Sequence, residues 1–412
     1  MEPANRLPVK YEKAKAGNQT QSRKARRNTR RKLFVAMLVV VSAINIFKGG
    51  SLTIVRGFLK ELCAGRPLSA EALSIVVFCH SAKLFDGVDM SGVKFCEKPL
   101  SRKNWLLRLF YEYVWFWFWS RNKDVDYWIS MHDMTPNVKA KHRFVYCHNP
   151  APFYSGKSLW KYEPSFEVFR LFYKYLYRCN IHRNDGVIVQ QEWLRKAFCD
   201  KFRLNPRKVI VALPETKPAT TGTELGRKVG RETKIVIYPA IPRPFKNFEV
   251  LLEAMALMKL HPLKLVLTIS GDENRYARVV RARCQHLKNV ELAGYLNQTE
   301  MLELYQRADS MVFPSKLETW GLPLSEFKQF QKPIFAADLP YARETLGSYS
   351  KTAFFHPDNH VELAQYLRSL VEGDFVERDP STTMVYEPPF AKNWGQLIEL
   401  LGLFSSRKGV VG

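Results

Sequence analysis

The sequence predicts an α/β protein with two doubly wound parallel sheets. Short β-branched apolar runs alternate with helical patterns along most of the 412 residues, which is typical of parallel βαβ units. A polar stretch at 214–233, with proline and glycine but no periodicity, interrupts this alternation, and the alternation resumes after it. At ~100–200 residues per domain the length also favours more than one domain. We therefore expect a cleft between the carboxyl ends of two sheets.

Composition excludes several classes of protein. A hydrophobic share of 46% rules out a disordered or fibrous chain. The seven cysteines form no CxxC pair, which argues against a disulfide scaffold or a zinc ribbon and favours a reducing compartment. The chain has 63 Lys and Arg against 39 Asp and Glu, a net charge of +24. That excess indicates an anionic partner: nucleic acid, anionic lipid or a phosphorylated substrate.

The amino-terminal segment concentrates positive charge. Residues 1–32 hold 11 Lys and Arg against two Glu, and we interpret them as a disordered basic tail. Such a tail is merely solvated, or it is the product of a misassigned start codon, or it contacts an anionic membrane surface. Attraction to such a surface contributes ~1 kcal/mol per basic residue. The apolar run at 33–47 is too short to span a bilayer. It has features of a signal peptide, but Gly49-Gly50 and a helical pattern follow it, so we favour the strand and turn that open an α/β domain.

The order of elements divides the chain. We predict an N-terminal Rossmann-like domain at 33–213 that faces acceptor and membrane, a linker at 214–233, and a C-terminal Rossmann-like domain at 234–384. We expect the helix within 385–412 to pack back on the first domain. After the first strand, predicted strands of the first domain are 73–79, 125–130, 143–147, 186–189 and 209–212, with helices at 104–120, 165–179 and 191–202. In the second domain strands are predicted at 234–238, 263–270, 290–292, 310–313 and 333–336, with helices at 248–260, 275–286, 300–308, from about 322, and 361–371.

The most informative motif is PSKLETWGLPLSE at 314–326. Glu318 and Glu326 lie eight residues apart, with Gly321 between them and a helix predicted from Leu322. A glycine approach to a helix N-terminus favours phosphate, and the two carboxylates would reach sugar hydroxyls on either side of it. The alternative is that Glu326 is a surface residue favoured by the helix dipole.

This motif, with QKPIFAAD at 331–338, resembles the donor-site signature of retaining glycosyltransferases of the GT-B fold, in the group 1 or family 4 class. The resemblance covers 234–370 well and 33–212 more loosely. WISMHDMTP, YCHNPAPFY and YPAIPRPFKNFEVLLEA resemble segments of glycosyltransferases of bacterial lipopolysaccharide and O-antigen assembly. One departure is Gln331-Lys332-Pro333, where the family usually has glycine before the proline.

The resemblance implies roles for matching positions. Glu326 would bind the nucleotide ribose and Glu318 the hydroxyls of the donor sugar. Lys246 would neutralise the donor diphosphate, stabilising the leaving group without a metal. Arg243 is the nearest substitute for the usual partner arginine, whose position is held by Ile241. Backbone groups would lie near the sugar and phosphate at Trp320, Gly321 and Leu322. Without the resemblance, Arg243 and Lys246 would be taken as solvated loop charges.

Further candidates follow predicted strands. His148 would lie beside the reacting carbon of the sugar, with His132 as the second candidate, because both end strands that face the cleft. Gly49 and Gly50 match a glycine loop that lets the backbone approach the diphosphate, and Gly271 resembles a nucleotide-facing turn. A lone histidine or glycine pair is more often structural.

The chain shows no metal site. Asp124-Val125-Asp126 mimics a metal-binding DxD motif but precedes a strand, and no His/Cys/Asp cluster has ligand spacing. The aromatic segment at 105–119 is too short to span a membrane. It is either a helix packed on the sheet, which we favour, or an interfacial helix, with Trp and Tyr at the headgroup layer and basic flanks on lipid phosphates.

We therefore predict a retaining hexosyltransferase that needs no cofactor or metal. It would take a nucleotide-diphosphate sugar and a lipid-linked glycan acceptor, act in lipopolysaccharide or related surface polysaccharide synthesis, bind no nucleic acid, and lie in the cytoplasm against the inner face of the cytoplasmic membrane. One alternative is an epimerase or phosphorylase of the same fold. The other is a non-enzymatic basic adaptor for membrane or nucleic acid.

Overall fold

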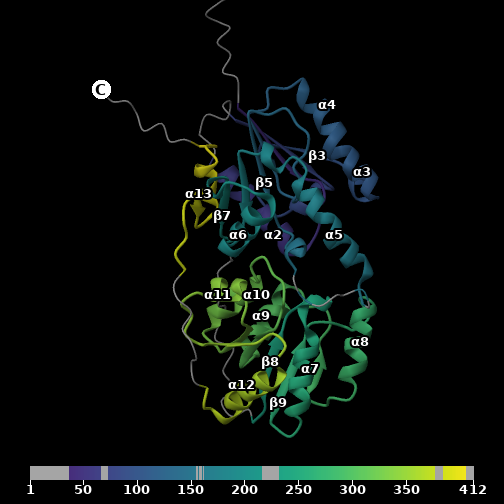
Figure 1. Cartoon of the computed structure of the whole chain (residues 1–412), viewed down its shortest axis with the longest axis vertical. Helices are drawn as coiled ribbons and strands as arrows, with labels where there is room; N and C mark the ends of the chain where they lie inside the picture. Colours follow the sequence, from purple (N-terminus) through teal and green to yellow (C-terminus); the bar gives the residue numbers. More distant parts are fainter. Residues whose placement is uncertain are drawn as a thin grey trace, which may run out of the picture.

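A computed structural model describes residues 37–65, 73–154, 156, 160, 162–215, 232–375 and 384–404. The predicted tail at 1–32 and nearly all of the predicted linker lie outside this part of the chain. The described residues form two α/β domains stacked along the long axis of the molecule (Figure 1). The prediction of two doubly wound, Rossmann-like domains is confirmed, because each domain has a parallel sheet flanked by helices.

The N-terminal domain is built on an eight-stranded parallel sheet in the order β14-β7-β6-β5-β4-β1-β2-β3. Strands β3 to β6 follow the 3-2-1-4-5-6 order of a doubly wound fold, with the reversal between β1 and β4. Its strands are β1 (Met37–Ala43), β2 (Leu73–Cys79), β3 (Val93–Glu97), β4 (Tyr127–Ser130), β5 (His142–Tyr146), β6 (Gly186–Val189), β7 (Val209–Ala212) and β14 (Phe390–Ala391). Its helices are α2 (Gly49–Ala64), α3 (Trp105–Phe110), α4 (Phe116–Arg121), α5 (Pro164–Arg178), α6 (Glu192–Phe202) and α13 (Trp394–Leu400).

The C-terminal domain repeats this order with six parallel strands, β10-β9-β8-β11-β12-β13, and reverses between β8 and β11. Its strands are β8 (Lys234–Tyr238), β9 (Leu263–Leu267), β10 (Val290–Leu292), β11 (Ser310–Phe313), β12 (Ile334–Ala337) and β13 (Thr352–Phe355). Its helices are α7 (Phe248–Leu257), α8 (Arg275–Cys284), α9 (Gln298–Arg307), α10 (Leu322–Phe327), α11 (Pro340–Leu346) and α12 (His360–Glu372).

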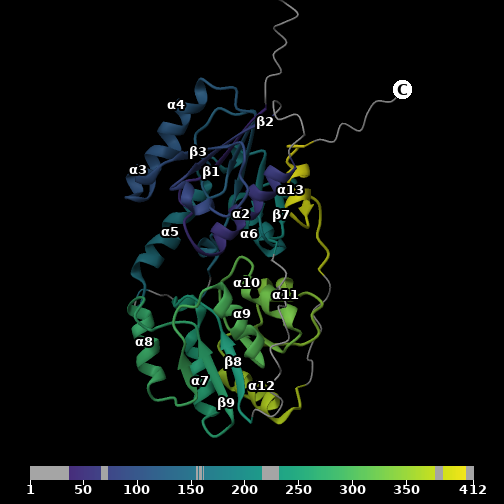
Figure 2. The ribbon, with the colours of Figure 1, turned by 180° about the vertical axis from the view of Figure 1, so that it is seen from behind.

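The last described segment returns from the second domain to the first, as Figures 1 and 2 show along one side of the molecule. Strand β14 pairs with β7, and α13 packs on α2. Trp394 of α13 is buried with its ring 6.0 Å from the ring of Phe58. The chain therefore closes on its first domain, and this segment contributes to the core of that domain.

Several local features differ from the sequence-based expectation, and strands β13 and β14 and helix α11, of four, two and seven residues, were not predicted. Strand β3 has no predicted counterpart, because it is a half-exposed edge strand with little continuous apolar character. The single helix predicted at 104–120 contains a π-helical turn, Tyr111–Trp115, between α3 and α4. Strand β9 ends at Leu267, three residues before the predicted end.

Candidate active site between the two domains

The reversal of strand order in the C-terminal sheet brings two loops together. Lys246 lies in the loop after β8 and Glu318 in the loop after β11, and these neighbouring strands leave a crevice at their carboxyl ends. The Lys246 ammonium donates to the Glu318 carboxylate, and each side chain is about one-sixth exposed. The two residues that the sequence assigns to the donor are thus in direct contact at one site.

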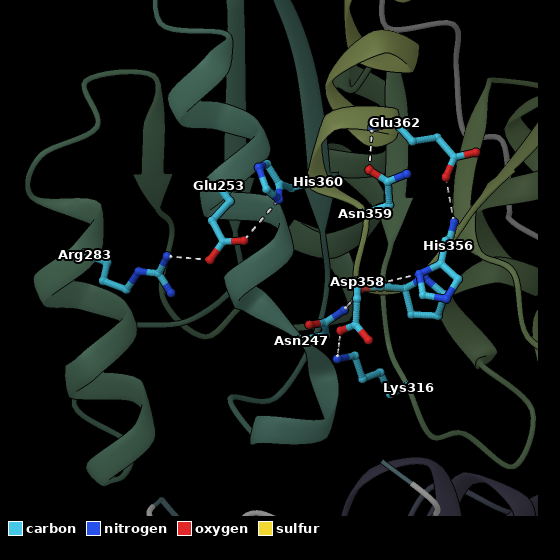
Figure 3. Close-up of polar contacts among 10 residues, drawn as sticks. Asn247, Glu253, Arg283, Lys316, His356, Asp358, Asn359, His360 and Glu362 are labelled. Atoms are coloured by element: carbon cyan, nitrogen blue, oxygen red, sulfur yellow. Dashed lines mark hydrogen bonds and ion pairs between the residues drawn. The ribbon is translucent and has the colours of Figure 1, made fainter. Parts of the chain in front are cut away.

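Asn247 fixes these two loops to each other. Its backbone is left-handed, with φ of 59°, and its side-chain amide donates to Pro314 O at 3.2 Å and Pro357 O at 2.7 Å. Lys316 N also donates to Phe245 O at 2.8 Å. Figure 3 shows Asn247 beside the Lys316–Asp358 ion pair. A buried amide that bonds two carbonyls holds both loops at a defined separation.

The loop around Gly321 depends on its backbone conformation. Gly321 has φ of +79°, a region that residues with a Cβ rarely adopt. The Trp320 indole is buried and donates to Ser325 Oγ at 2.8 Å. The Trp320 carbonyl accepts from the Thr345 hydroxyl, and Thr345 accepts from the Gln191 amide of the N-terminal domain at 2.8 Å. This chain of hydrogen bonds connects the first domain to the backbone of the donor motif.

Arg243 lies in an inter-domain ion pair. Its guanidinium Nη1 donates to Glu163 Oε1 at 2.5 Å, and Glu163 belongs to the first domain. Ile241, at the position of the family arginine, is 63% exposed and supplies no charge. Arg243 thus already has an acidic partner in the first domain, a contact that the sequence does not reveal, and the expectation that it meets a diphosphate beside Lys246 stays a prediction.

Glu326 and Gly271 lie in different surroundings from Glu318. The Tyr305 hydroxyl donates to Glu326 Oε2 at 2.9 Å, and burial raises the pKa of the Glu326 carboxyl above its usual value. Gly271 has φ of +89°, and a Cβ there would lie 2.6 Å from Arg281 Cβ. The amide of Gly271 donates to Glu273 at 2.9 Å. Tight packing on α8 therefore already explains the glycine at 271.

The two glycines after β1 lie at the start of α2, which corrects their predicted placement in a loop. Gly49 has φ of +70°, and a Cβ added to it would meet nothing within 4 Å. A Cβ on Gly50 would come within 3.0 Å of Leu322 Cδ1 in the C-terminal domain. The start of α2 and the start of α10 thus face each other across the domain boundary.

The two histidines differ sharply in accessibility. His148 borders a cavity of the first domain; its Nε2 lies 3.0 Å from Met131 O, and burial lowers the pKa of its imidazole. His132 is fully buried, with Nε2 2.9 Å from Ser42 Oγ and 3.4 Å from Glu112 Oε1. The prediction that His132 touches a sugar is at odds with this burial, and we describe it as a positioning residue behind the cleft.

Burial keeps the Glu112–His132 contact neutral. Loss of solvent raises the pKa of the Glu112 carboxyl to about 8, although Arg108 opposes the shift. Loss of solvent and the Arg108 charge lower the pKa of the His132 imidazole to about 3. Both pKa shifts disfavour charge on these side chains, so burial favours a contact between two neutral groups.

A cleft of about 700 Å³ lies between the domains at this site, and Glu318 lines it. Its wall comprises 152–154, Arg170, Trp193, Ala197, Asp200 and Lys201 from the first domain and 316–318 and 339–341 from the second. Sequence reasoning missed Arg170, Lys201 and Lys316. Their signal was weak, because each is one basic residue among many in a chain of charge +24.

The DxD-like segment plays a structural part. Asp126 accepts hydrogen bonds from Leu38 N at 2.8 Å and Lys141 Nζ at 2.6 Å. In the described ranges no group of three or more His, Cys, Asp or Glu side chains is placed to hold a metal ion.

Comparisons with known proteins bear on the family and the fold. Residues 226–382 match the family described as glycosyl transferases group 1. An uncharacterized glycosyltransferase of Methanocaldococcus jannaschii is 23% identical over 189 residues, which are 43% of this chain and 48% of that protein. The chain thus spans about half the length of that relative.

Solved structures of other proteins are similar to this two-domain architecture. The lipopolysaccharide outer core galactosyltransferase WaaB superposes with a TM-score of 0.59 at 11% identity, over 83% of this chain and 92% of that one. The fold is GT-B. Anabaena HepE in complex with UDP-glucose gives a TM-score of 0.57 at 13% identity, over 82% and 90% of the two chains. The GT-B cleft of this chain is the space between its sheets, where Glu318 lies.

Proposed function

We propose that this protein is a retaining glycosyltransferase that moves a hexose from a nucleotide-diphosphate sugar to a lipid-linked glycan, in lipopolysaccharide or related surface polysaccharide synthesis. The observation that carries the proposal is the Lys246–Glu318 pair at the cleft, in the segment that matches the group 1 family. A UDP-glucose complex of a protein with the same fold supports the class of donor, and WaaB supports the type of pathway.

The site residues would divide the chemistry between them. Lys246 would stabilise the negative charge that develops on the departing diphosphate. Glu318 would accept hydrogen bonds from sugar hydroxyls once the donor competes for its lysine. Glu326 would hold the ribose. The neutral imidazole of His148 would contact the sugar from the first domain, and closure of the cleft would exclude water and limit hydrolysis.

The helical segment from α3 to α4 supports attachment to a membrane surface, because its buried face contains charged side chains and its exposed face is apolar. Residues at 108, 112, 116 and 120 are buried and include Arg108 and Glu112. The opposite face carries apolar side chains, with Leu106 78% and Phe118 58% exposed, and Phe110 and Val114 also exposed. A helix that turns hydrophobic residues to the outside fits an interfacial position.

Helix α5 extends this surface. Val168, Leu171, Phe172 and Tyr175 are exposed on it, and the Trp105 ring of α3 lies 6.2 Å from the Phe169 ring of α5. Figures 1 and 2 show the two helical segments along the same side of the first domain. No helix in the described part of the chain is long and apolar enough to cross a bilayer. We therefore propose peripheral attachment at the cytoplasmic face of the membrane.

A binding screen tests the assignment of the donor site. Purified full-length protein is titrated with a panel of nucleotide sugars, and binding is measured by calorimetry. We expect one sugar nucleotide to bind in the micromolar range and Lys246→Ala to weaken it at least tenfold. Lys264→Ala is the control, since Lys264 forms an exposed ion pair with Glu291 away from the cleft. If wild type and Lys246→Ala bind the sugar nucleotide with equal affinity, the assignment of Lys246 to the donor site is wrong.

A further inference from the structure

A second cavity, of about 540 Å³, lies wholly within the N-terminal domain, among the loops after β1, β4 and β5 and the adjoining helices. We infer that it binds a phosphate or diphosphate ester carried on an apolar chain, and that this ester is the anchoring group of the acceptor. The inference rests on the proposed function and specifies its acceptor.

Four cations line this cavity: Lys48, Arg102, Lys103 and Arg108. None of the four forms an ion pair with a carboxylate in the described ranges. Lys48, Arg102 and Lys103 are exposed at the rim, where the Arg102 guanidinium lies 3.4 Å from the centre of the Phe47 ring. Four cations against one carboxylate, Asp133, around a single concave surface create a positive potential there.

Arg108 is the buried member of the set. It is only 4% exposed, and one guanidinium nitrogen donates to His132 O at 3.1 Å. Its Nε has no hydrogen-bond partner among the described residues. Leaving a buried guanidinium N–H without a hydrogen-bond partner is costly, and an anion that reaches it would relieve that cost.

One carboxylate, Asp133, also borders the cavity, but protein donors already surround it. The hydroxyls of Tyr173 and Tyr177 each donate to Asp133 at 2.8 Å. The backbone amide of Asn149 donates at 3.0 Å, and that of His148 donates to the same oxygen. Asp133 therefore positions the loop after β5, and as the one carboxylate against four cations it leaves the lining with a formal charge of 4 − 1 = +3.

The start of α2 adds backbone donors to this surface. This 16-residue helix has no side-chain hydrogen bond at its N-cap, Lys48, and no acidic residue in its first turn. Lys48 and Ser51 both line the cavity. The unpaired amides of a helix N-terminus and the positive end of its dipole favour a phosphate, so they add to the four side-chain cations.

An apolar path leads away from the cavity. Trp105 and Phe169 line it, and Leu106, Phe110 and Phe172 are exposed on the same two helices. A ligand with its phosphate among the cations can therefore lay a hydrocarbon chain along the apolar surface of α3 and α5. This arrangement fits an amphipathic ester better than a free nucleotide.

The cavity borders the catalytic cleft through one shared segment. His148 and Asn149 line the cavity, whereas 152–154 line the cleft with Glu318. Every residue that lines the cavity belongs to the first domain, and the motif assigned to the donor belongs to the second. The position therefore suits the acceptor, with its sugar directed past His148 toward the cleft.

Geranyl diphosphate is a soluble probe of this chemistry, and quenching of tryptophan fluorescence reports its binding because Trp105 lines the cavity. We expect wild type to bind geranyl diphosphate at least tenfold more tightly than geraniol or inorganic pyrophosphate. The triple variant Lys48→Ala/Arg102→Ala/Lys103→Ala should lose at least tenfold in affinity. The matched control Lys83→Ala/Lys94→Ala/Lys139→Ala replaces three exposed lysines of the same domain that do not line the cavity, and should bind like wild type.

Binding of the nucleotide sugar found in the donor screen separates this inference from the proposed function. The triple variant should retain it. If wild type binds the nucleotide sugar but not geranyl diphosphate, the inference falls while the proposed function stands. Equal affinity for pyrophosphate and geranyl diphosphate contradicts the apolar part of the inference. Competition between the nucleotide sugar and geranyl diphosphate would assign the cavity to the donor and overturn the inference.

Discussion

At the scale of single residues, hydrogen bonds from buried side chains that do not line the cleft fix the backbone of the donor motif. Gln191 donates to Tyr341 O at 3.1 Å and to Thr345 Oγ1 at 2.8 Å. The Thr345 hydroxyl in turn donates a hydrogen bond to the Trp320 carbonyl, next to Gly321. Both Gln191 and Thr345 are buried, so these polar groups bond only within the protein and specify the loop conformation.

Thr345→Val tests this support. Valine keeps the volume but removes the hydroxyl, so we expect a loss of ~1–3 kcal/mol in stability from the unpaired groups and a donor affinity several-fold weaker. Thermal unfolding and calorimetry measure the two effects. Thr352→Val is a matched control, because Thr352 is buried and its hydroxyl has no partner among the described residues. The idea fails if both variants bind the donor like wild type.

Sequence reasoning at this scale reached residues within a contiguous motif. Glu318 is marked by its spacing from Glu326 and by the family resemblance, whereas Lys246 is marked by the resemblance alone, and the roles of both stay predictions. The Glu163 partner of Arg243 and the Gln191–Thr345 contact were not predicted, because partners about 80 and 154 residues apart depend on how the domains dock. The burial of His132 also depends on α3 and the π-helical turn, which cover it. The position of His132 at the end of a predicted strand does not show this cover.

At the scale of elements, the helical segment α3–α4 combines a polar buried face with an apolar exposed face. The sequence pattern alone shows a mainly aromatic stretch and leaves packed and interfacial positions as alternatives. In the structure one face packs against the domain and the other is apolar and exposed, while contact of that exposed face with a membrane stays a prediction. Phe116 packs against Trp128 at 4.9 Å between ring centres, while the stripe at 106, 110, 114 and 118 faces outward.

Phe110→Ser/Phe118→Ser tests the exposed stripe. Burial of a large apolar side chain contributes ~1.5–3 kcal/mol, so the double variant should lose well over tenfold in partition onto vesicles of phosphatidylcholine and phosphatidylglycerol. Cosedimentation measures it. Leu260→Ser/Tyr295→Ser removes two exposed apolar residues of the other domain and should sediment like wild type. Equal loss in both variants would show that the effect is unspecific.

At the scale of the whole molecule, the two domains meet through Glu344. Its carboxylate accepts from the amide of Glu192 at 2.7 Å and that of Trp193 at 3.4 Å, at the start of α6. Burial nevertheless raises the pKa of Glu344 from 4.5 to about 7. The folded protein therefore keeps a proton on Glu344 that the unfolded chain releases near pH 4.5, and this contribution to stability is lost as pH rises from about 4.5 to 7.

Glu344→Gln removes this titration and keeps an oxygen that can accept a hydrogen bond. Between pH 4 and pH 8, the free energy of unfolding of wild type should fall by roughly 3 kcal/mol relative to that of Glu344→Gln. The size follows because one pKa unit is worth about 1.36 kcal/mol. Urea titrations at both pH values measure it. A difference that stays constant with pH contradicts the role given to Glu344; Glu253→Gln, at an exposed carboxylate, is the control.

Most of the architecture follows from the sequence, because alternating apolar runs and helices leave few arrangements for a parallel sheet. Strand β3 was not predicted because it lacks an apolar signal, and β13, β14 and α11 were not predicted because they are short. Sequence patterns do not show how the domains dock, nor the cavity beneath α3 and α5, which gathers Lys48, Arg102 and Arg108 from separate segments.

The central claim is that Lys246 and Glu326 bind the nucleotide sugar from which the protein transfers a sugar. The most direct measurement is the turnover of that sugar nucleotide with acceptor present, following nucleotide release and transferred sugar by mass spectrometry. Lys246→Ala and Glu326→Ala should each lower transfer by about a hundredfold, equivalent to ~2.7 kcal/mol, with circular dichroism spectra like wild type, while Lys264→Ala stays fully active. Transfer near the wild-type rate in both variants would contradict the account.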